Sequence, residues 1–167
     1  YMPIALTAGN GALNASADAV RLYIDMGSYT AFFRSKDGGT EGSSGQTVNL
    51  SAGTKYYFTV VNNNRSLTAT IRTGSHSGTL VNTITTTCSS GITGLTHIQT
   101  GGATGTNSGA ASYSFDNIEI WNDATSASGT ATYTENFSSA TVWTSANPTY
   151  SSVNASTNKL DFDFDNA

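Results

Sequence analysis

Residues 56–73 read YYFTVVNNNRSLTATIRT, and this stretch decides the fold. In residues 66–73 apolar side chains alternate with polar ones; the apolar positions are Leu67, Ala69 and Ile71. Successive side chains of a strand point to opposite faces, so this pattern predicts a strand with one face in a core and one in water. Residues 55–61 are apolar on both faces, which predicts a central strand covered twice. The Asn run at 62–64 favours a tight turn, and the two strands are therefore expected to form a hairpin.

The same alternation recurs at residues 20–26 and 160–165. Polar side chains of these two segments, expected to face water, are Arg21, Tyr23, Asp25, Asp161, Asp163 and Asp165. Strand signals recur about every 10 to 15 residues, with Gly, Ser and Asn between them and no helical period. This rhythm predicts an all-β, antiparallel β-sandwich with almost no helix. The side chains expected in its core are Leu67, Ile71, Phe58, Phe115, Ile118 and Phe162.

Three segments resemble the middle and closing strands of a concanavalin A-like (laminin G-like) jelly-roll domain, a family strung in tandem along microbial cell-surface proteins. They are AVRLYIDMGSYTAFFRSKD (19–37), SAGTKYYFTVVNNNRSLTATIRTGSHSG (51–78) and ASYSFDNIEIWND (111–123), with FDNIEIW as the closing strand. Residues 132–167, which contain ENFSS and KLDFDFD, resemble the opening strands of the same family. The chain is thus similar to such a domain read out of phase, with its opening strands at the C-terminal end.

This resemblance implies a division of the chain. Residues 1–123 supply middle and closing strands, 124–131 a flexible linker, and 132–167 the opening strands that complete this or a neighbouring sandwich. A sandwich without its first strands exposes core and an unpaired sheet edge. Either the domain is circularly permuted and closes on itself, or copies complete one another by strand exchange, head to tail. The family pattern includes one more strand, between KLDFDFDNA and YMPIALTAG, that this chain lacks, and its absence favours exchange.

Charge and composition exclude several partners. Charged residues make up 11% of the chain, the formal net charge is −4, and the seven basic residues do not cluster. Nucleic acid and anionic membrane surfaces are therefore not expected partners. No apolar run approaches the ~18 residues that span a bilayer, so membrane insertion is not expected. A surface solvated by hydroxyls and amides is common in secreted β-proteins, and we expect an extracellular or cell-surface location.

Cys88 is the only cysteine, which excludes an internal disulfide and favours a small buried side chain. Five N-x-[ST] sequons are candidate glycosylation sites, although a chain so rich in Ser and Thr contains several by chance. These sequons lie at Asn14, Asn49, Asn64, Asn136 and Asn154.

Asp161-x-Asp163-x-Asp165 is the strongest catalytic motif. Laminarinase-like enzymes with this jelly roll carry three acids at the same spacing on one strand, where hydrolysis needs a nucleophile and a general acid. Their outer acids are Glu and their motif lies on a middle strand, so we expect a water-facing strand and no enzyme. These three carboxylates together with Asp116 are candidate calcium ligands, and no other cofactor is expected.

Aromatic residues suggest carbohydrate binding as an alternative, because a sugar ring stacks on a flat aromatic face. The candidates are Tyr23, Tyr29, Trp143 and Tyr150.

Three functions therefore remain open. The first is a non-catalytic extracellular structural module, a subunit of a cell-surface filament, adhesin or surface array assembled with copies of itself through donated β-strands. The second is a carbohydrate-binding, lectin-like module with glycans as partners, and the third is a degenerate glycoside hydrolase. The family resemblance does not separate them, because one fold hosts many functions.

Overall fold

The computed structural model describes the chain at residues 2–8, 18–43, 45–63, 65–93, 95, 97–100, 111–115, 118–120, 133–135, 151–154 and 159–164. The chain divides into two compact units, Tyr1–Gly105 and Thr106–Ala167. Every regular element found in the described residues is a β-strand, and every pairing is antiparallel, which confirms the predicted all-β class. These residues include no helix long and apolar enough to cross a membrane.

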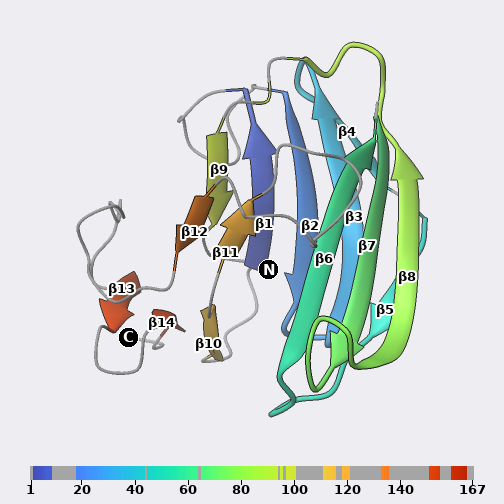
Figure 1. The fold of residues 1–167 in the computed structure, drawn as a ribbon. Helices are drawn as coiled ribbons and strands as arrows, with labels where there is room; N and C mark the ends of the chain where they lie inside the picture. The colour runs from blue at the N-terminus through green and yellow to red at the C-terminus, as the bar shows by residue number, and fades with distance from the viewer. Residues whose placement is uncertain are drawn as a thin grey trace. The chain divides into compact units, whose positions relative to one another are not determined.

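The first unit contains a six-stranded sheet of order β4-β3-β2-β1-β9, with β5 also paired to β3 (Figure 1). Its strands are β1 (Met2–Thr7), β2 (Ala19–Asp25), β3 (Thr30–Asp37), β4 (Thr40–Ser43), β5 (Val48–Asn49) and β9 (His97–Thr100). The register places Leu22 between Ile4 on one side and Phe33 on the other. Paired residues share a face, so these side chains form one continuous apolar row across three strands.

A three-stranded sheet of order β6-β7-β8 completes the first unit. Its strands are β6 (Tyr56–Asn63), β7 (Ser66–Thr73) and β8 (Thr79–Thr87). The predicted hairpin is confirmed, because β6 and β7 pair up to Asn63 opposite Ser66. Arg65 takes a positive φ of 74° in the turn, and its N–H donates to the side-chain oxygen of Asn62.

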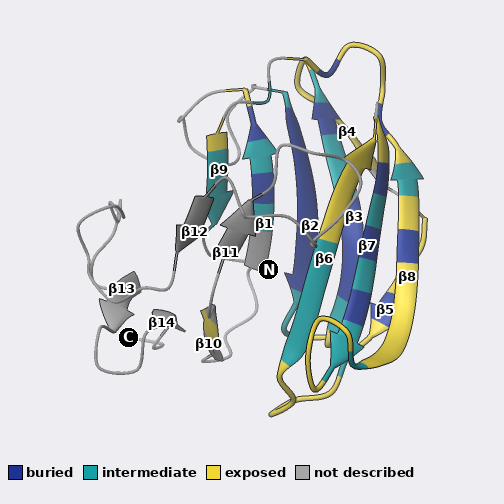
Figure 2. Ribbon diagram, in the orientation of Figure 1, coloured by how far each residue is buried: buried dark blue, intermediate teal, exposed yellow. Residues whose placement is uncertain are grey.

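The apolar residues of the two sheets form a core, an arrangement consistent with a β-sandwich (Figure 2). Predicted core residues Leu67 and Ile71 are fully buried, whereas Phe58 is only half-buried. Cys88 is buried as expected, and burial raises the pKa of its thiol while the charge of Arg65 opposes that shift. The side chains of the other predicted core residues lie outside the described part; they are Phe115, Ile118 and Phe162.

The prediction that residues 55–61 form a central strand is wrong for the described part of the chain, where β6 pairs with β7 alone. The side chains of β6 are half-buried in its first half and exposed in its second, where Val60 and Val61 lie. An apolar pattern on both faces predicts that other elements pack against both faces of a strand, but it does not identify those elements.

The prediction that Arg21 and Tyr23 face water is also wrong. Both side chains are buried, so β2 is covered on both faces from Ala19 to Ile24. Alternation alone does not distinguish a water-facing row from a buried row whose polar groups are hydrogen-bonded.

The second unit contains a three-stranded sheet, order β10-β14-β13, and a separate pair, β11-β12. Their bounds are β10 (Ala111–Phe115), β11 (Ile118–Ile120), β12 (Tyr133–Glu135), β13 (Ser151–Asn154) and β14 (Lys159–Phe164). The segment expected to close a sandwich, β10 and β11, thus pairs with the segment expected to open one, β14 and β12. The predicted linker, residues 124–131, lies outside the described residues, and the two units divide at Gly105 and Thr106.

Candidate functional site

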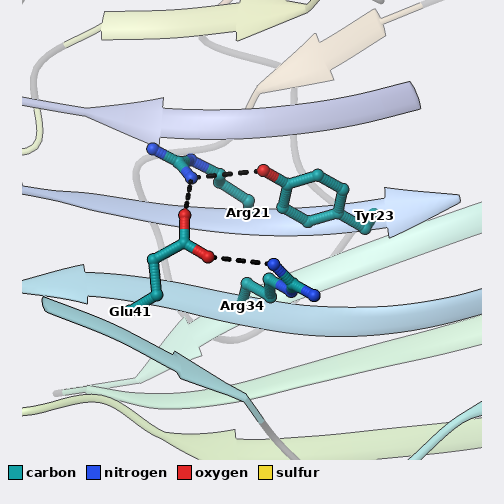
Figure 3. A network of polar contacts seen from close by, with 4 residues as sticks. All are labelled: Arg21, Tyr23, Arg34 and Glu41. Atoms are coloured by element: carbon teal, nitrogen blue, oxygen red, sulfur yellow. Dashed lines mark hydrogen bonds and ion pairs between the residues drawn. The ribbon is translucent and has the colours of Figure 1, made fainter. Parts of the chain in front are cut away.

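A polar cluster joins the three strands β2, β3 and β4 (Figure 3). The carboxylate of Glu41 accepts one hydrogen bond from Arg21 Nη1 at 3.0 Å and another from Arg34 Nη1 at 2.9 Å. Arg21 Nη1 also donates to the hydroxyl of Tyr23 at 3.2 Å. One carboxylate therefore bridges two guanidinium groups, and the buried Arg21 side chain has partners for its charge.

The pairing of strands explains why this cluster needs an acid. Arg21 lies directly opposite Arg34 in the β2–β3 ladder, and like charges in that position repel. Glu41 enters from β4, where Lys36 is its cross-strand partner, and supplies the missing negative charge. The arrangement is a clamp across three strands, because the Glu41 carboxylate bonds an arginine of β2 and an arginine of β3.

Two aromatic rings lie beside the clamp. Tyr23 and Phe32 stack at 5.6 Å between centroids with planes 7° apart, and the guanidinium carbon of Arg34 lies 5.5 Å from each ring centroid. Both rings are buried, so neither offers an open face to a sugar in this structure. The exposed atoms of the cluster belong to Arg34 and Glu41, whose side chains are 39% and 40% exposed.

An open hollow of about 450 Å³ lies at the end of β3 and along β4. Its lining is polar and consists of Ser35, Asp37, Thr40, Glu41, Gly42 and Ser89. The Ser89 hydroxyl donates to Asp37, and Gly91 lies so close to that carboxylate that a side chain at position 91 would collide with it. Hydroxyls and carboxylates of this kind can bond the hydroxyl groups of a sugar.

Asp18 ties together the loops next to this hollow. Its carboxylate accepts the backbone N–H of Gly38 at 3.0 Å and of Thr93 at 3.3 Å. These two hydrogen bonds hold the pKa of Asp18 below its ordinary value, because they stabilise the charged form. Asp18 therefore holds the β3–β4 turn and the loop after β8 at the start of β2.

The outer edge of β8 is capped by side chains. The N–H of Thr85 donates to Gln46 Oε1 at 2.8 Å, and the N–H of Thr83 donates to Asn82 Oδ1 at 2.8 Å. Gln46 comes from the segment just before β5, so it reaches from one sheet to the edge of the other. With both amides occupied, this edge offers a poor template for a further strand.

The residues predicted from the sequence as sites are not gathered in one place. Tyr23 is buried in the clamp, whereas Tyr29 is 42% exposed at the β2–β3 turn, where it adopts a positive φ of 51°. Asp161 and Asp163 lie in β14, opposite Ser114 and Ser112 of β10. Asn49 is exposed in β5, and Asn154 ends β13. Predicted residues outside the described part are Trp143, Tyr150, Asp116, Asp165, Asn14, Asn64 and Asn136.

Sequence reasoning missed the residues of the clamp. Arg34 and Glu41 are seven residues apart in the sequence, and nothing in this spacing indicates a cluster. The available signal was the pairing of the strand that contains Arg21 with the strand that contains Arg34, which predicts that an acid must lie nearby. In the described residues, no group of three or more His, Cys, Asp or Glu is placed to hold a metal ion.

Comparison with known proteins adds no relative. No family model matches the chain, and neither a curated protein nor a solved structure matches it.

Proposed function

We propose that this chain is a non-catalytic extracellular structural module, a subunit of a cell-surface filament, adhesin or surface array whose copies assemble through donated β-strands. The observation that carries the proposal is the pairing within the second unit, where β10 joins β14 and β11 joins β12. Opening-type strands thus complete closing-type strands there, as they would between successive jelly-roll domains. The same ladders can form within one chain or between copies, which is the basis of domain swapping.

Charge supports an association between unlike parts of two copies. Residues 1–105 contain six Lys or Arg and four Asp or Glu, a formal net charge of +2, whereas residues 106–167 contain one Lys and seven Asp or Glu, a net charge of −6. The second unit of one copy is therefore attracted to the first unit of another. Such a head-to-tail contact extends into a filament when the rotation between copies does not close a ring.

A substitution in β14 tests this function. Phe162 lies in the middle strand of its sheet, opposite Tyr113 on one side and Ser151 on the other. Proline there removes a ladder hydrogen bond, so Phe162→Pro should abolish assembly, while Phe162→Leu keeps the pairing and should assemble as the native chain does. Sedimentation velocity and electron microscopy give the readout. Assembly by the proline variant equal to that of the leucine variant would rule out donation of these strands.

The polar hollow favours a second candidate, a carbohydrate-binding module. Its carboxylates and hydroxyls, among them Asp37, Glu41 and Ser89, suit the hydroxyl groups of a glycan. A glycan array tests it with Asp37→Asn and, as a control outside the hollow, Asp25→Asn at the end of β2, where Asp25 is half-buried. Binding that is lost only in Asp37→Asn supports the module, and native protein that binds no glycan argues against it.

A further inference from the structure

The core of the first unit is open at one corner. Val60, Ala69 and Ile84 lie in one row across β6, β7 and β8 and therefore share a face. Ala69 and Ile84 are 0% and 2% exposed, whereas Val60 is 41% exposed. In this row the apolar layer is therefore buried at Ile84 on β8 and exposed at Val60 on β6, although Leu80 and Val81 elsewhere on β8 are also 50% and 39% exposed. A single exposed apolar side chain is ordinary on a protein surface, so docking at Val60 depends on the main-chain edge beside it.

The main chain of β6 points in the direction needed to receive a strand. Thr85 on β8 directs its N–H away from β7, since that group bonds to Gln46. In an antiparallel pair, two residues opposite each other direct their N–H and C=O groups either both toward each other or both away. Thr68, opposite Thr85, therefore directs these groups toward β6. Val61, opposite Thr68, directs its own toward β7. It follows that Val60 and its neighbours at alternate positions direct their N–H and C=O groups to the outer edge of β6; these are Phe58, Val60 and Asn62.

The two edges of this sheet differ in protection. On β8 the outward amides of Thr83 and Thr85 are occupied by side-chain oxygens. On β6, positions 56–63 contain no charged residue and no proline, which are the usual devices that keep an edge from pairing. Among the described residues the outer edge of β6 has neither a paired strand nor a capping side chain, which makes it a better acceptor for strand addition than the edge of β8.

The second unit contains an element that needs such an edge. β11 and β12 form a two-stranded sheet, and an isolated pair of strands is only marginally stable in water. The sequence of β11 is Ile118-Glu119-Ile120, so it supplies apolar residues at alternate positions of a strand. The unit to which this pair belongs has a net charge of −6, against +2 for the unit that contains β6.

We infer that the outer edge of β6, from Tyr56 to Asn63, is the acceptor to which the β11–β12 pair of a second copy adds as the next strands of the β6-β7-β8 sheet. This inference rests on the proposed function and names the surface through which copies would assemble. The added pair extends the sheet from three strands to five and covers Val60.

Two glutamate substitutions in the full-length chain test the acceptor. Val60→Glu places a negative charge at the open corner, where it repels the acidic second unit and opposes burial. Thr83→Glu makes the same charge change on the exposed face of β8, at the capped edge. Val60→Glu should weaken assembly at least tenfold by sedimentation equilibrium, and Thr83→Glu should leave it unchanged.

Hydrogen exchange on the native protein provides a second measurement that needs no variant. The amides of Phe58, Val60 and Asn62 should exchange at least tenfold more slowly in the assembled state than in dilute protein, while those of Thr83 and Thr85 should not change. Assembly that persists in Val60→Glu, without protection of β6, overturns the acceptor but not the proposed function. Native protein that does not assemble at all overturns the proposed function. A monomer whose β6 amides are already protected shows that the edge is filled within one chain, and this also overturns the inference.

Discussion

Val60 on β6 lies directly opposite Ala69 on β7, yet Val60 is 41% exposed while Ala69 is 0% exposed. Two side chains paired across adjacent strands share a face, so the contrast marks the boundary of the core within a single pair. In this row Ile84 on β8 is buried and Val60 on β6 is exposed. The proposed assembly depends on that difference.

Leu67 and Leu80 give a matched pair for the core. Leu67 is fully buried and Leu80 is 50% exposed. We expect Leu67→Ala to lower the free energy of unfolding by about 2–5 kcal/mol, because it removes buried methyl groups and leaves a cavity. Leu80→Ala should change it by less than about 0.5 kcal/mol. Urea denaturation of both variants measures the difference, and equal losses would show that the assignment of the core to this face is wrong.

Features that depend on local sequence were predictable, whereas features that depend on the pairing of distant strands were not. Local alternation was enough for Leu67 and Ile71, and the Asn run was enough for the hairpin of β6 and β7. The clamp was not predictable in the same way, because Glu41 meets Arg21 only after β4 pairs with β3 and β3 with β2. The exposure of Val60 was not predicted. The pattern of apolar residues indicates which positions are apolar, but it does not indicate which other elements pack against them.

Arg21 should not tolerate lysine. Its guanidinium donates to both Glu41 and Tyr23 from a buried position, and a lysine ammonium lacks the planar fork that makes such bonds. We expect Arg21→Lys to destabilise the fold by about 1–3 kcal/mol. Arg34→Lys is the control, since Arg34 bonds the same carboxylate from an exposed position. A melting temperature equally lowered in both variants would contradict a special role for the buried arginine.

Asp18 should contribute a pH-dependent term to stability. Its hydrogen bonds to the N–H groups of Gly38 and Thr93 lower its pKa in the folded state. A depressed carboxyl pKa stabilises the fold above the unfolded value of about 3.9, and this stabilisation is lost as the pH falls through the folded value. Asp18→Asn should therefore lower the melting temperature at about pH 6 and lower it less at about pH 2.5. An equal decrease at both pH values would exclude the charge of Asp18 as the cause.

Gln46 should protect the edge of β8. Its side-chain oxygen accepts the N–H of Thr85, and alanine at this position removes that acceptor. We expect the Thr85 amide to exchange with solvent about fivefold faster in Gln46→Ala, which corresponds to a loss of about 1 kcal/mol of protection. The amide of Thr83, which bonds to Asn82, serves as the internal reference. An unchanged exchange rate at Thr85 would mean that Gln46 is not the cap.

The most direct test of assembly by donated strands is the solution mass of an equimolar mixture of Val60→Glu chains and Ile118→Pro chains, whose proline lies in β11. The first variant lacks a working acceptor on β6 and the second lacks a working donor in the second unit, so each alone should remain a monomer of 17.3 kDa. Together they offer one intact donor and one intact acceptor, and sedimentation equilibrium should show one-to-one dimers that grow no further. A mixture that stays monomeric at concentrations where the native chain assembles would contradict the account, as would polymers formed by either variant alone.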